Sequence, residues 1–359
     1  MRAILLNPGP VSLSEAVRKA AVSVDLCHRE PEYFQLQARV RGDLLAVYGC
    51  DGSEWASVLL GGSGTTALEA MLTSLPGRDA RMLVLENGVY GERMARIAEI
   101  HGIACEALQF GWTEPIDFGR VEHSLATGTF THLAAVHHET TTGRLNDVAR
   151  LADLCVRHDV ELLLDAVSSF GAEDIPFDSP ALAACAATAN KCLHGIPGLC
   201  FVVARRSALA NCAQPPRSLY LDLSLWLGKQ DQDSTPFTPP VNALLALDKA
   251  LEELRRHGGW KARHAHYGKL AGRVRRALTA GGVEAMLPAN QSSCVLVSYR
   301  IPEGLSYAAI HDGLKQWGFV IYAGQGDLAS QLFRISTMGD ITHYDMERLL
   351  AAIESVFSA

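Results

Sequence analysis

The chain has 359 residues, of which 48% are hydrophobic and 20% are charged, and its formal net charge is −7. A chain of this length can bury a large core and is expected to form two domains. Its negative charge argues against nucleic acid or an anionic membrane as the main partner. No apolar run reaches the roughly 18 to 20 residues that a membrane span needs, and the amino-terminal apolar run is too short for a signal peptide.

Strand and helix patterns alternate between residues 58 and 205. The expected strands are 58–60, 81–86, 104–110, 132–137, 161–165, 183–189 and 198–204, and the expected helices are 67–75, 91–101 and 146–158. Alternation at this spacing predicts an α/β fold in which helices cover both faces of a mostly parallel, seven-stranded sheet.

The flanking regions have a different pattern. Residues 215–240 are rich in proline and polar residues, and they form a stretch too long for a plain connector, which indicates a function. Helices at 241–257, 260–280, 307–316 and 344–357 and strands at 294–299, 319–322 and 332–336 are expected to follow. We therefore expect a large α/β domain (25–245), a small carboxyl-terminal α+β domain (246–359), and an amino-terminal segment (1–24) that packs on the small domain or the active site.

Nine cysteines are scattered along the chain without a C-x-x-C pair. An odd number excludes a complete disulfide framework. Because most of them lie in apolar segments, we expect buried free thiols in a protein of the reducing cytoplasm. Cys192 follows a lysine, but we expect it to serve packing rather than to act as a nucleophile.

Two of the expected strands lead into charged residues. The strand at 161–165 ends on Asp165, and the strand at 183–189 is followed by Asn190 and Lys191. Parallel strands carry their carboxyl ends to one edge of the sheet, where α/β folds bind ligands. A carboxylate and an amine in one crevice suit an enzyme that uses pyridoxal phosphate. The lysine would form the Schiff base, and the aspartate would keep the pyridine nitrogen protonated.

A glycine-rich loop at residues 61–67 (GGSGTTA) joins a strand to a helix. Glycines let the backbone approach an anion, and the helix start offers free N–H groups, so the loop suits a phosphate. Residues 62–67 also match the dinucleotide pattern G-x-G-x-x-A, with Glu86 about 20 residues further on, so an NAD(P)-dependent enzyme is an alternative. We favour the phosphate interpretation because the alternative gives Asp165 and Lys191 no role.

Two more segments suggest contact with a cofactor. In residues 137–143 (HHETTTG), His137 and His138 are adjacent on a strand and point to opposite faces, so we expect no metal site there. A strand-end loop that touches a cofactor is the favoured interpretation. Tyr90 follows a strand between two glycines, where its ring suits either a planar cofactor or an ordinary turn.

The order and spacing of several motifs resemble the class-V, fold-type-I aminotransferases, a family that uses pyridoxal phosphate. The motifs are NPGP at 7–10, GGSGTTALE at 61–69, NGVYGER at 87–93, HETTTG at 138–143, DAVSSFG at 165–171, ANKC at 189–192, GIPG at 195–198, RSLYLDL at 217–223 and FRISTMG at 333–339. Within the family, the resemblance is closest to members that move the amino group of 2-aminoethylphosphonate to pyruvate in phosphonate catabolism, giving phosphonoacetaldehyde and alanine. Aminotransfer from alanine or serine to glyoxylate, and a transaminase or lyase acting on another aminophosphonate, are the alternatives.

The resemblance implies roles for the cofactor-binding residues. Lys191 would form the Schiff base and act as the base of the proton shift, with a lowered pKa. Asp165 would pair with the pyridine nitrogen, while Val167 and Tyr90 would pack on the two faces of the ring. Thr141, with Thr140 as the alternative, would lie near the phenolic oxygen. The phosphate would be held by Ser63, Gly64, Thr65, Asn190 and, from the partner subunit of a homodimer, Thr238.

The resemblance also implies where the substrate binds. Arg334 would clamp the substrate carboxylate or phosphonate, for which the guanidinium fork is suited. Pro8 and Gly9 would line the same site. His28 and Arg29 belong to a segment, residues 27–33, that folds over the substrate entrance in this family. That segment differs from the Trp/Asp-rich version of other aminoethylphosphonate enzymes, and it also suits the start of a surface helix.

Overall fold

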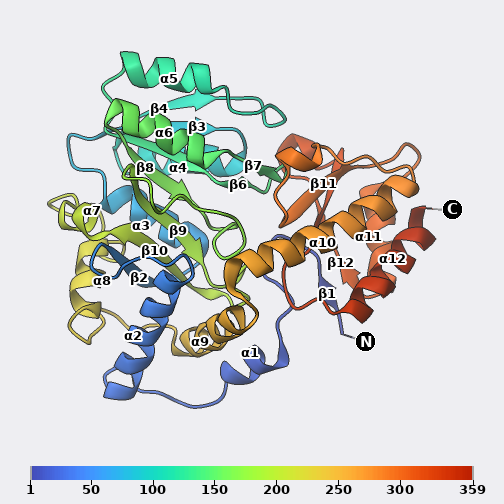
Figure 1. Ribbon diagram of the computed structural model, residues 1–359, viewed down its shortest axis with the longest axis horizontal. Coiled ribbons are helices and arrows are strands. Elements are labelled where there is room, and N and C mark those ends of the chain that lie inside the picture. Colours follow the sequence, from blue (N-terminus) through green and yellow to red (C-terminus); the bar gives the residue numbers. More distant parts are fainter. Residues whose placement is uncertain (1, 358–359) are drawn as a thin grey trace.

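The computed structural model describes residues 2–357 and has a seven-stranded sheet at its centre (Figure 1). The order of its strands is β2–β10–β9–β8–β5–β3–β4. The strands are β2 (Trp55–Gly62), β3 (Arg81–Glu86), β4 (Ala104–Gln109), β5 (His132–Val136), β8 (Glu161–Asp165), β9 (Leu182–Thr188) and β10 (Gly198–Arg205). All run parallel except β10, which is antiparallel to both of its neighbours. The predicted α/β class with a mostly parallel sheet is confirmed.

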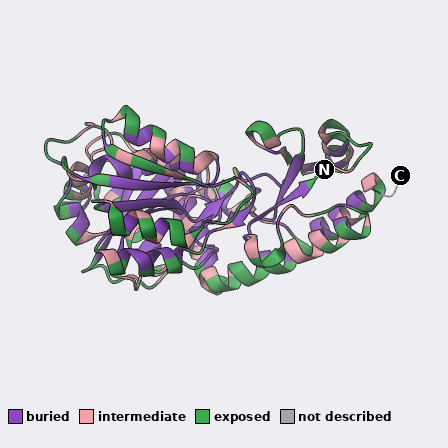
Figure 2. Ribbon diagram, turned by 90° about the horizontal axis from the view of Figure 1, so that it is seen from above, coloured by how far each residue is buried: buried purple, intermediate pink, exposed green. Residues whose placement is uncertain are grey.

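Helices cover both faces of the sheet, and each face has its own apolar core. Successive strand residues point to opposite sides, so Leu162 and Leu164 belong to one core and Leu163 to the other. The first core also receives side chains from α2 (Pro31–Ala46), α5 (Phe118–Thr127), α6 (Val148–His158) and α9 (Val241–Arg256). The second receives them from α3 (Gly64–Ser74), α4 (Val89–Ile100), α7 (Arg206–Ala210) and α8 (Leu223–Gln230). Figure 2 shows the buried sheet between half-exposed helices.

The carboxyl-terminal part forms a smaller layer beside this sheet (Figure 1). It has a three-stranded sheet of order β11–β14–β13 and three helices. These elements are α10 (Gly259–Ala280), β11 (Leu296–Arg300), α11 (Tyr307–Gln316), β12 (Phe319–Val320), β13 (Tyr322–Ala323), β14 (Leu332–Ser336) and α12 (His343–Phe357). Near the amino terminus, β1 (Ile4–Leu5) pairs in parallel with β12, which ties the amino-terminal segment to the carboxyl-terminal part. The exact domain boundaries stay predictions.

Several elements differ from the sequence-based expectations. β2 is longer than the predicted 58–60, because Trp55, Ala56 and Ser57 also pair with β10. The strand predicted at 319–322 is two short strands in different sheets, β12 and β13. Helix α8 lies inside the stretch that was expected to be irregular, and α2 and α5 were not predicted. The remaining short elements are α1 (Glu15–Ala20), β6 (His138–Glu139), β7 (Arg144–Leu145) and the 3₁₀ turns Ala289–Gln291 and Gly326–Leu328.

The strand order locates the crevice where a ligand binds in folds of this kind. The chain passes from β3 to β4 on one side and then returns to place β5 on the other side of β3. Ligands of open α/β sheets bind at such a reversal, beyond the carboxyl ends of the strands. By contrast, β2 lies at the edge of the sheet, so the loop after it does not have the position of a dinucleotide-binding loop. Between residues 2 and 357, no helix has the length and apolar character of a membrane span.

Candidate active site

Asp165 is the last residue of β8 and lies at the carboxyl edge of the sheet. Its side chain is buried, with 4% exposure, and its Oδ1 accepts a hydrogen bond of 2.9 Å from the Val167 N–H. Burial raises the pKa of Asp165, whereas that hydrogen bond and the charge of Lys191 act to lower it. Within residues 2–357, no cation forms an ion pair with this carboxylate, so the site lacks the positive partner that a buried carboxylate needs.

Lys191 lies on the loop after β9, beside Tyr90, which was predicted to pack on the cofactor, and beside the amino-terminal segment, which was predicted to line the substrate site. Its Nζ is 5.9 Å from the centre of the Tyr90 ring. The amino-terminal segment crosses it at Gly9, where an added Cβ would be only 2.9 Å from Lys191 Cγ. Gly9 also has φ +104°, which side chains rarely tolerate. Both features indicate that glycine is needed for the segment to pass this close.

The loop between β2 and α3 offers a free helix start. Ser63 is the N-cap of α3, but its side chain makes no capping hydrogen bond, and the first turn contains no acidic residue. A Cβ on Gly64 would lie 2.5 Å from Val167 Cγ1, so the helix start and Val167 are in close contact. Arg93, which we did not predict, donates a 3.2 Å hydrogen bond to Thr65 Oγ1. Free helical N–H groups and this guanidinium together favour a bound anion.

Glu139 connects the loops that follow β3 and β5. Its Oε1 accepts hydrogen bonds from the N–H (3.0 Å) and the hydroxyl (2.6 Å) of Thr141, and its Oε2 accepts one from the Tyr90 N–H at 3.2 Å. Burial raises the pKa of Glu139 to about 7. We did not predict that Glu139 connects these loops, although a glutamate in the polar segment that ends a buried strand was a usable signal.

The two threonines at this strand end differ in the use of their hydroxyl groups. Thr141 Oγ1 donates to Glu139 and also accepts from the Val89 N–H at 3.2 Å. Thr140 Oγ1 is buried and has no hydrogen-bond partner within the described residues. Thr140 therefore has the hydroxyl that is still available to a ligand.

The residues described so far, among them Lys191 and Thr140, form the cluster around Lys191. Arg334 reaches this cluster from β14 of the small sheet. It is 4% exposed, and Nη1 donates to the Thr140 carbonyl oxygen and to Gln325 Oε1, both at 2.9 Å. Nε donates to the Ala323 carbonyl oxygen at 2.8 Å. Among residues 2–357, no carboxylate pairs with this guanidinium and Nη2 has no hydrogen bond. Burial lowers the pKa of Arg334, which shows that its charge is poorly solvated, and such a group favours an incoming anion.

Other predicted residues lie at or beyond the edge of this cluster. Asn190 precedes Lys191, and its Oδ1 accepts a 2.8 Å hydrogen bond from Thr188 Oγ1. Pro8 is buried next to Gly9. Arg29 is exposed and donates to the Thr235 carbonyl oxygen at 3.0 Å. His28 is half-buried and Thr238 is exposed, and in the described chain no hydrogen bond links either of them, or Arg29, to the cluster.

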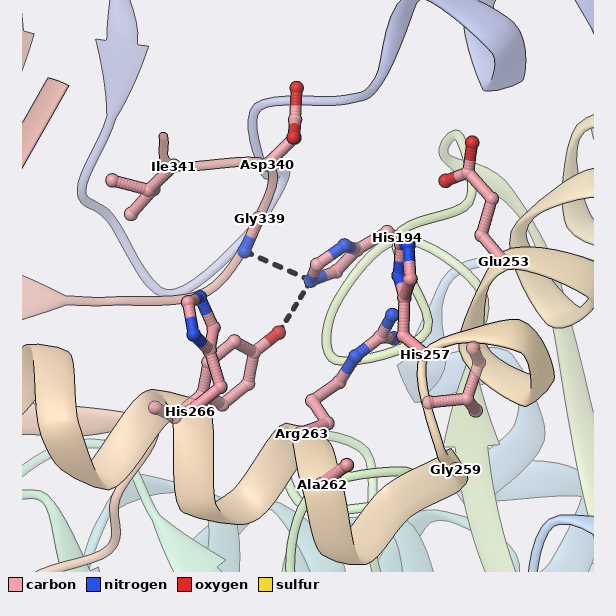
Figure 3. A pocket seen from close by; sticks show the side chains of 12 residues that line it. His194, Glu253, His257, Gly259, Ala262, Arg263, His266, Gly339, Asp340 and Ile341 are labelled. Atoms are coloured by element: carbon pink, nitrogen blue, oxygen red, sulfur yellow. Dashed lines mark hydrogen bonds between the residues drawn. The ribbon is translucent and has the colours of Figure 1, made fainter. Parts of the chain in front are cut away.

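The loop after Lys191 is held by α10 and by the segment after β14. His194 Nε2 accepts a 3.0 Å hydrogen bond from the Gly339 N–H and lies 2.5 Å from the Tyr267 hydroxyl oxygen (Figure 3). Arg263 donates to the Cys192 carbonyl oxygen. Burial raises the pKa of the Cys192 thiol to about 12, so it stays protonated and unreactive. These contacts fix the main chain on which Lys191 is carried.

The residues at this edge fit pyridoxal phosphate. Asp165 provides a buried carboxylate for a protonated pyridine nitrogen. The start of α3, together with Arg93, provides a site for the phosphate, and the close contact at Gly64 leaves no room for a side chain there. Tyr90 and Lys191 lie close enough for a ring and an amine to act on one planar group.

Comparisons with known proteins identify the family of the chain. Residues 52–338 match the family model "Aminotransferase class-V". The chain is 36% identical to a 2-aminoethylphosphonate–pyruvate transaminase from Klebsiella pneumoniae subsp. pneumoniae, with 98% of this chain and 97% of that protein covered. It is 40% identical to a protein of the same name from Syntrophobacter fumaroxidans, with 97% and 95% covered.

Solved structures show the same fold. An aspartate aminotransferase of subgroup IV from Thermus thermophilus is 29% identical with a TM-score of 0.90, and 99% of both chains is covered. A pyridoxamine–pyruvate aminotransferase from Mesorhizobium loti is 27% identical with a TM-score of 0.91, and 100% of this chain and 93% of that one are covered. The cofactor of the chain is pyridoxal phosphate. The family model matches residues 52–338, and the two transaminases are similar over nearly the whole chain. This chain therefore belongs to the class-V aminotransferases.

Proposed function

We propose that this aminotransferase moves the amino group of 2-aminoethylphosphonate to pyruvate, which gives phosphonoacetaldehyde and alanine. The choice of substrates is supported by relatives of that name that are 35–40% identical over nearly the whole chain. The observation that carries the proposal is Arg334, a buried guanidinium with an unused Nη2 beside the cluster around Lys191.

The described contacts support a role for each residue around the cofactor. Bound pyridoxal phosphate supplies an aldehyde that takes up the amino group and a ring that accepts electrons. Asp165 holds the ring nitrogen protonated, and Tyr90 and Val167 pack on the two ring faces. Ser63, Gly64, Thr65, Asn190 and Arg93 would hold the cofactor phosphate at the start of α3. Near the phenolic oxygen lies Thr141 or Thr140, of which Thr140 has the unused hydroxyl.

Lys191 moves the proton of the reaction. Its Nζ takes the proton that leaves the amine-bearing carbon of the substrate, and this requires a neutral amine. The contacts that fix the loop after Lys191 keep the amine in one position, which is the condition for efficient transfer.

Arg334 binds the anionic group of each substrate in turn. The amino donor carries a phosphonate and the acceptor carries a carboxylate, and a guanidinium fork can hold either one with two hydrogen bonds. Burial strengthens this attraction, because a charge that little water surrounds interacts more strongly with an incoming anion. Pro8 and Gly9 line the same site, and we assign His28 and Arg29 to its entrance.

We further propose a homodimer in the cytoplasm. Thr238 is exposed and does not reach the cluster of its own chain, as expected for a residue that contacts the phosphate of a partner subunit. All nine cysteines are free in the structure, which suits a reducing compartment.

A comparison of amino donors tests the proposed substrate. The rates with 2-aminoethylphosphonate, alanine, serine and other aminophosphonates are measured with pyruvate and with glyoxylate as acceptors. We expect the highest kcat/KM for 2-aminoethylphosphonate with pyruvate. A preference for alanine or serine with glyoxylate would assign the chain to another branch of the family.

A further inference from the structure

We propose that His264, Glu173 and Cys294 form a binding site for a zinc-class divalent cation. The site lies outside the cluster around Lys191, and the inference does not depend on the proposed function. His264 lies on α10, Glu173 follows β8 and Cys294 precedes β11. A cation at this point would therefore join three segments that are far apart in the sequence.

The donor atoms converge on one ring nitrogen. His264 Nδ1 is 3.1 Å from Glu173 Oε2 and 3.4 Å from Cys294 Sγ. The Ala172 carbonyl oxygen is 2.9 Å from the same nitrogen and 3.9 Å from the sulfur atom. All three side-chain donors lie within 4.8 Å of one another.

These separations fit tetrahedral zinc. With a Zn–N distance near 2.0 Å and a Zn–S distance near 2.3 Å, tetrahedral ligands are about 3.3–3.6 Å apart. The two separations from His264 Nδ1, 3.1 and 3.4 Å, need a shift of only a few tenths of an ångström, and the third pair of donors, Glu173 and Cys294, lies within 4.8 Å. The mixture of nitrogen, sulfur and oxygen donors also suits zinc better than calcium or magnesium, which bind oxygen.

The charges of the cluster already favour a cation. Glu173 is 1% exposed, and its Oε1 accepts from Ser293 Oγ and the Cys294 N–H, so Oε2 is left for His264. Oε2 of this buried carboxylate faces His264 Nδ1 at 3.1 Å, and a buried carboxylate needs a cationic partner.

An open cavity gives an ion access to the cluster. It has a volume of about 620 Å³ and is lined by both Glu173 and His264. His137 lines the same cavity with only 2% exposure, and its Nδ1 has no hydrogen-bond partner within residues 2–357. A histidine nitrogen without a partner in the described chain thus lies on the wall of the cavity that Glu173 and His264 also line.

Binding exchanges protons for the ion. The cation forms bonds to His264 Nδ1, Cys294 Sγ and Glu173 Oε2, and the protons of the thiol and of Nδ1 pass to the buffer. No oxidant or reductant is needed. Because the folded chain assembles the donors and an unfolded chain does not, the ion should raise the unfolding temperature. It would also anchor the start of β11, which pairs with Arg334 on β14.

The test uses the complete holoenzyme, freed of unbound cofactor and metal. Zn²⁺ is titrated by calorimetry, and Cd²⁺ is titrated while its thiolate absorption band is followed. We expect one ion per chain, a cadmium–thiolate band and a higher unfolding temperature. Cys294→Ser should remove the band, and His264→Gln should weaken binding at least about tenfold.

Matched variants separate this site from general metal binding. Cys27→Ser removes an exposed thiol elsewhere, and His266→Gln removes another histidine of α10, so both should keep the full binding signal. The cofactor absorbance and the metal-free unfolding temperature show that each variant is folded. If His264→Gln does not fold, the loss of the band in Cys294→Ser decides. Unchanged affinity and band in Cys294→Ser, or no saturable binding by the unaltered chain, would overturn the proposal.

Discussion

Arg334→Ala removes a guanidinium that is 4% exposed and has no carboxylate partner among the described residues. In the free enzyme the side chain donates to two main-chain oxygen atoms and to Gln325 Oε1. The substitution therefore has two separable effects, one on the bound anion and one on the protein itself. Lost contacts within the protein change stability, whereas the lost pair with the substrate changes KM.

The expected size of each effect follows from the contacts. Loss of a desolvated charged pair costs about 2–5 kcal/mol, which corresponds to a roughly 30- to 4,000-fold rise in KM. Three lost hydrogen bonds cost about 0.5–1.5 kcal/mol each in stability. Arg334→Lys should recover only part of the affinity, because an ammonium group cannot form the two parallel hydrogen bonds of a guanidinium.

The assay is steady-state kinetics with each substrate varied in turn, together with thermal unfolding and the cofactor spectrum. KM should rise for both pyruvate and 2-aminoethylphosphonate while the cofactor stays bound. Arg217→Ala is a matched control, because Arg217 likewise donates three hydrogen bonds within the protein, all of them to main-chain oxygen atoms, at Thr73, Pro76 and Gly77. It should lower stability without a comparable rise in KM. If KM for both substrates stays unchanged in Arg334→Ala, the anion binds elsewhere.

Three more outcomes are expected. Lys191→Ala should abolish turnover and the visible absorbance of the bound cofactor, and retention of both would refute its role. Asp165→Asn should lower kcat about a hundredfold, the scale of one preorganised electrostatic group, while the cofactor still binds; near-normal turnover would exclude the pairing with the ring nitrogen. Burial raises the pKa of Glu139 from 4.5 to about 7, so the folded state holds this proton more tightly and stability falls as the pH rises from about 4.5 to 7. Thermal unfolding between pH 5 and 7 should show a flatter decline in Glu139→Gln than in the unaltered chain, and equal slopes would contradict the buried, shifted carboxyl.

Much of the central sheet could be predicted from local pattern. The strands β3 and β8 have the predicted bounds, and each consists of an apolar run with one charged residue at either end, because the part of a strand that is buried on both faces is apolar at every position. The polar residues that follow such runs are then carried to the edge of the sheet. This is why Asp165 and Lys191 could be assigned to one crevice before any contact was known.

Helix α2 and the Glu139 network show where that reasoning failed. Apolar residues on α2 recur every four positions, at Leu36, Val40 and Leu44, yet the charged residues between them concealed a helix that packs on the sheet. The Glu139 hydrogen bonds join the loops of two strands, and no local pattern reports a contact between residues 49 positions apart.

By itself, the sequence determined the α/β class, the strands that carry Asp165 and Lys191, and the glycine loop at the start of α3, because burial and turn preferences act between neighbours in the chain. Only the tertiary structure decided that β10 runs antiparallel and that β2 lies at the sheet edge. It also brought Arg334 to Thr140 across 194 positions and Cys294 to His264 across 30. Such contacts depend on how distant elements pack on one another, and that packing leaves no periodic signal in the chain.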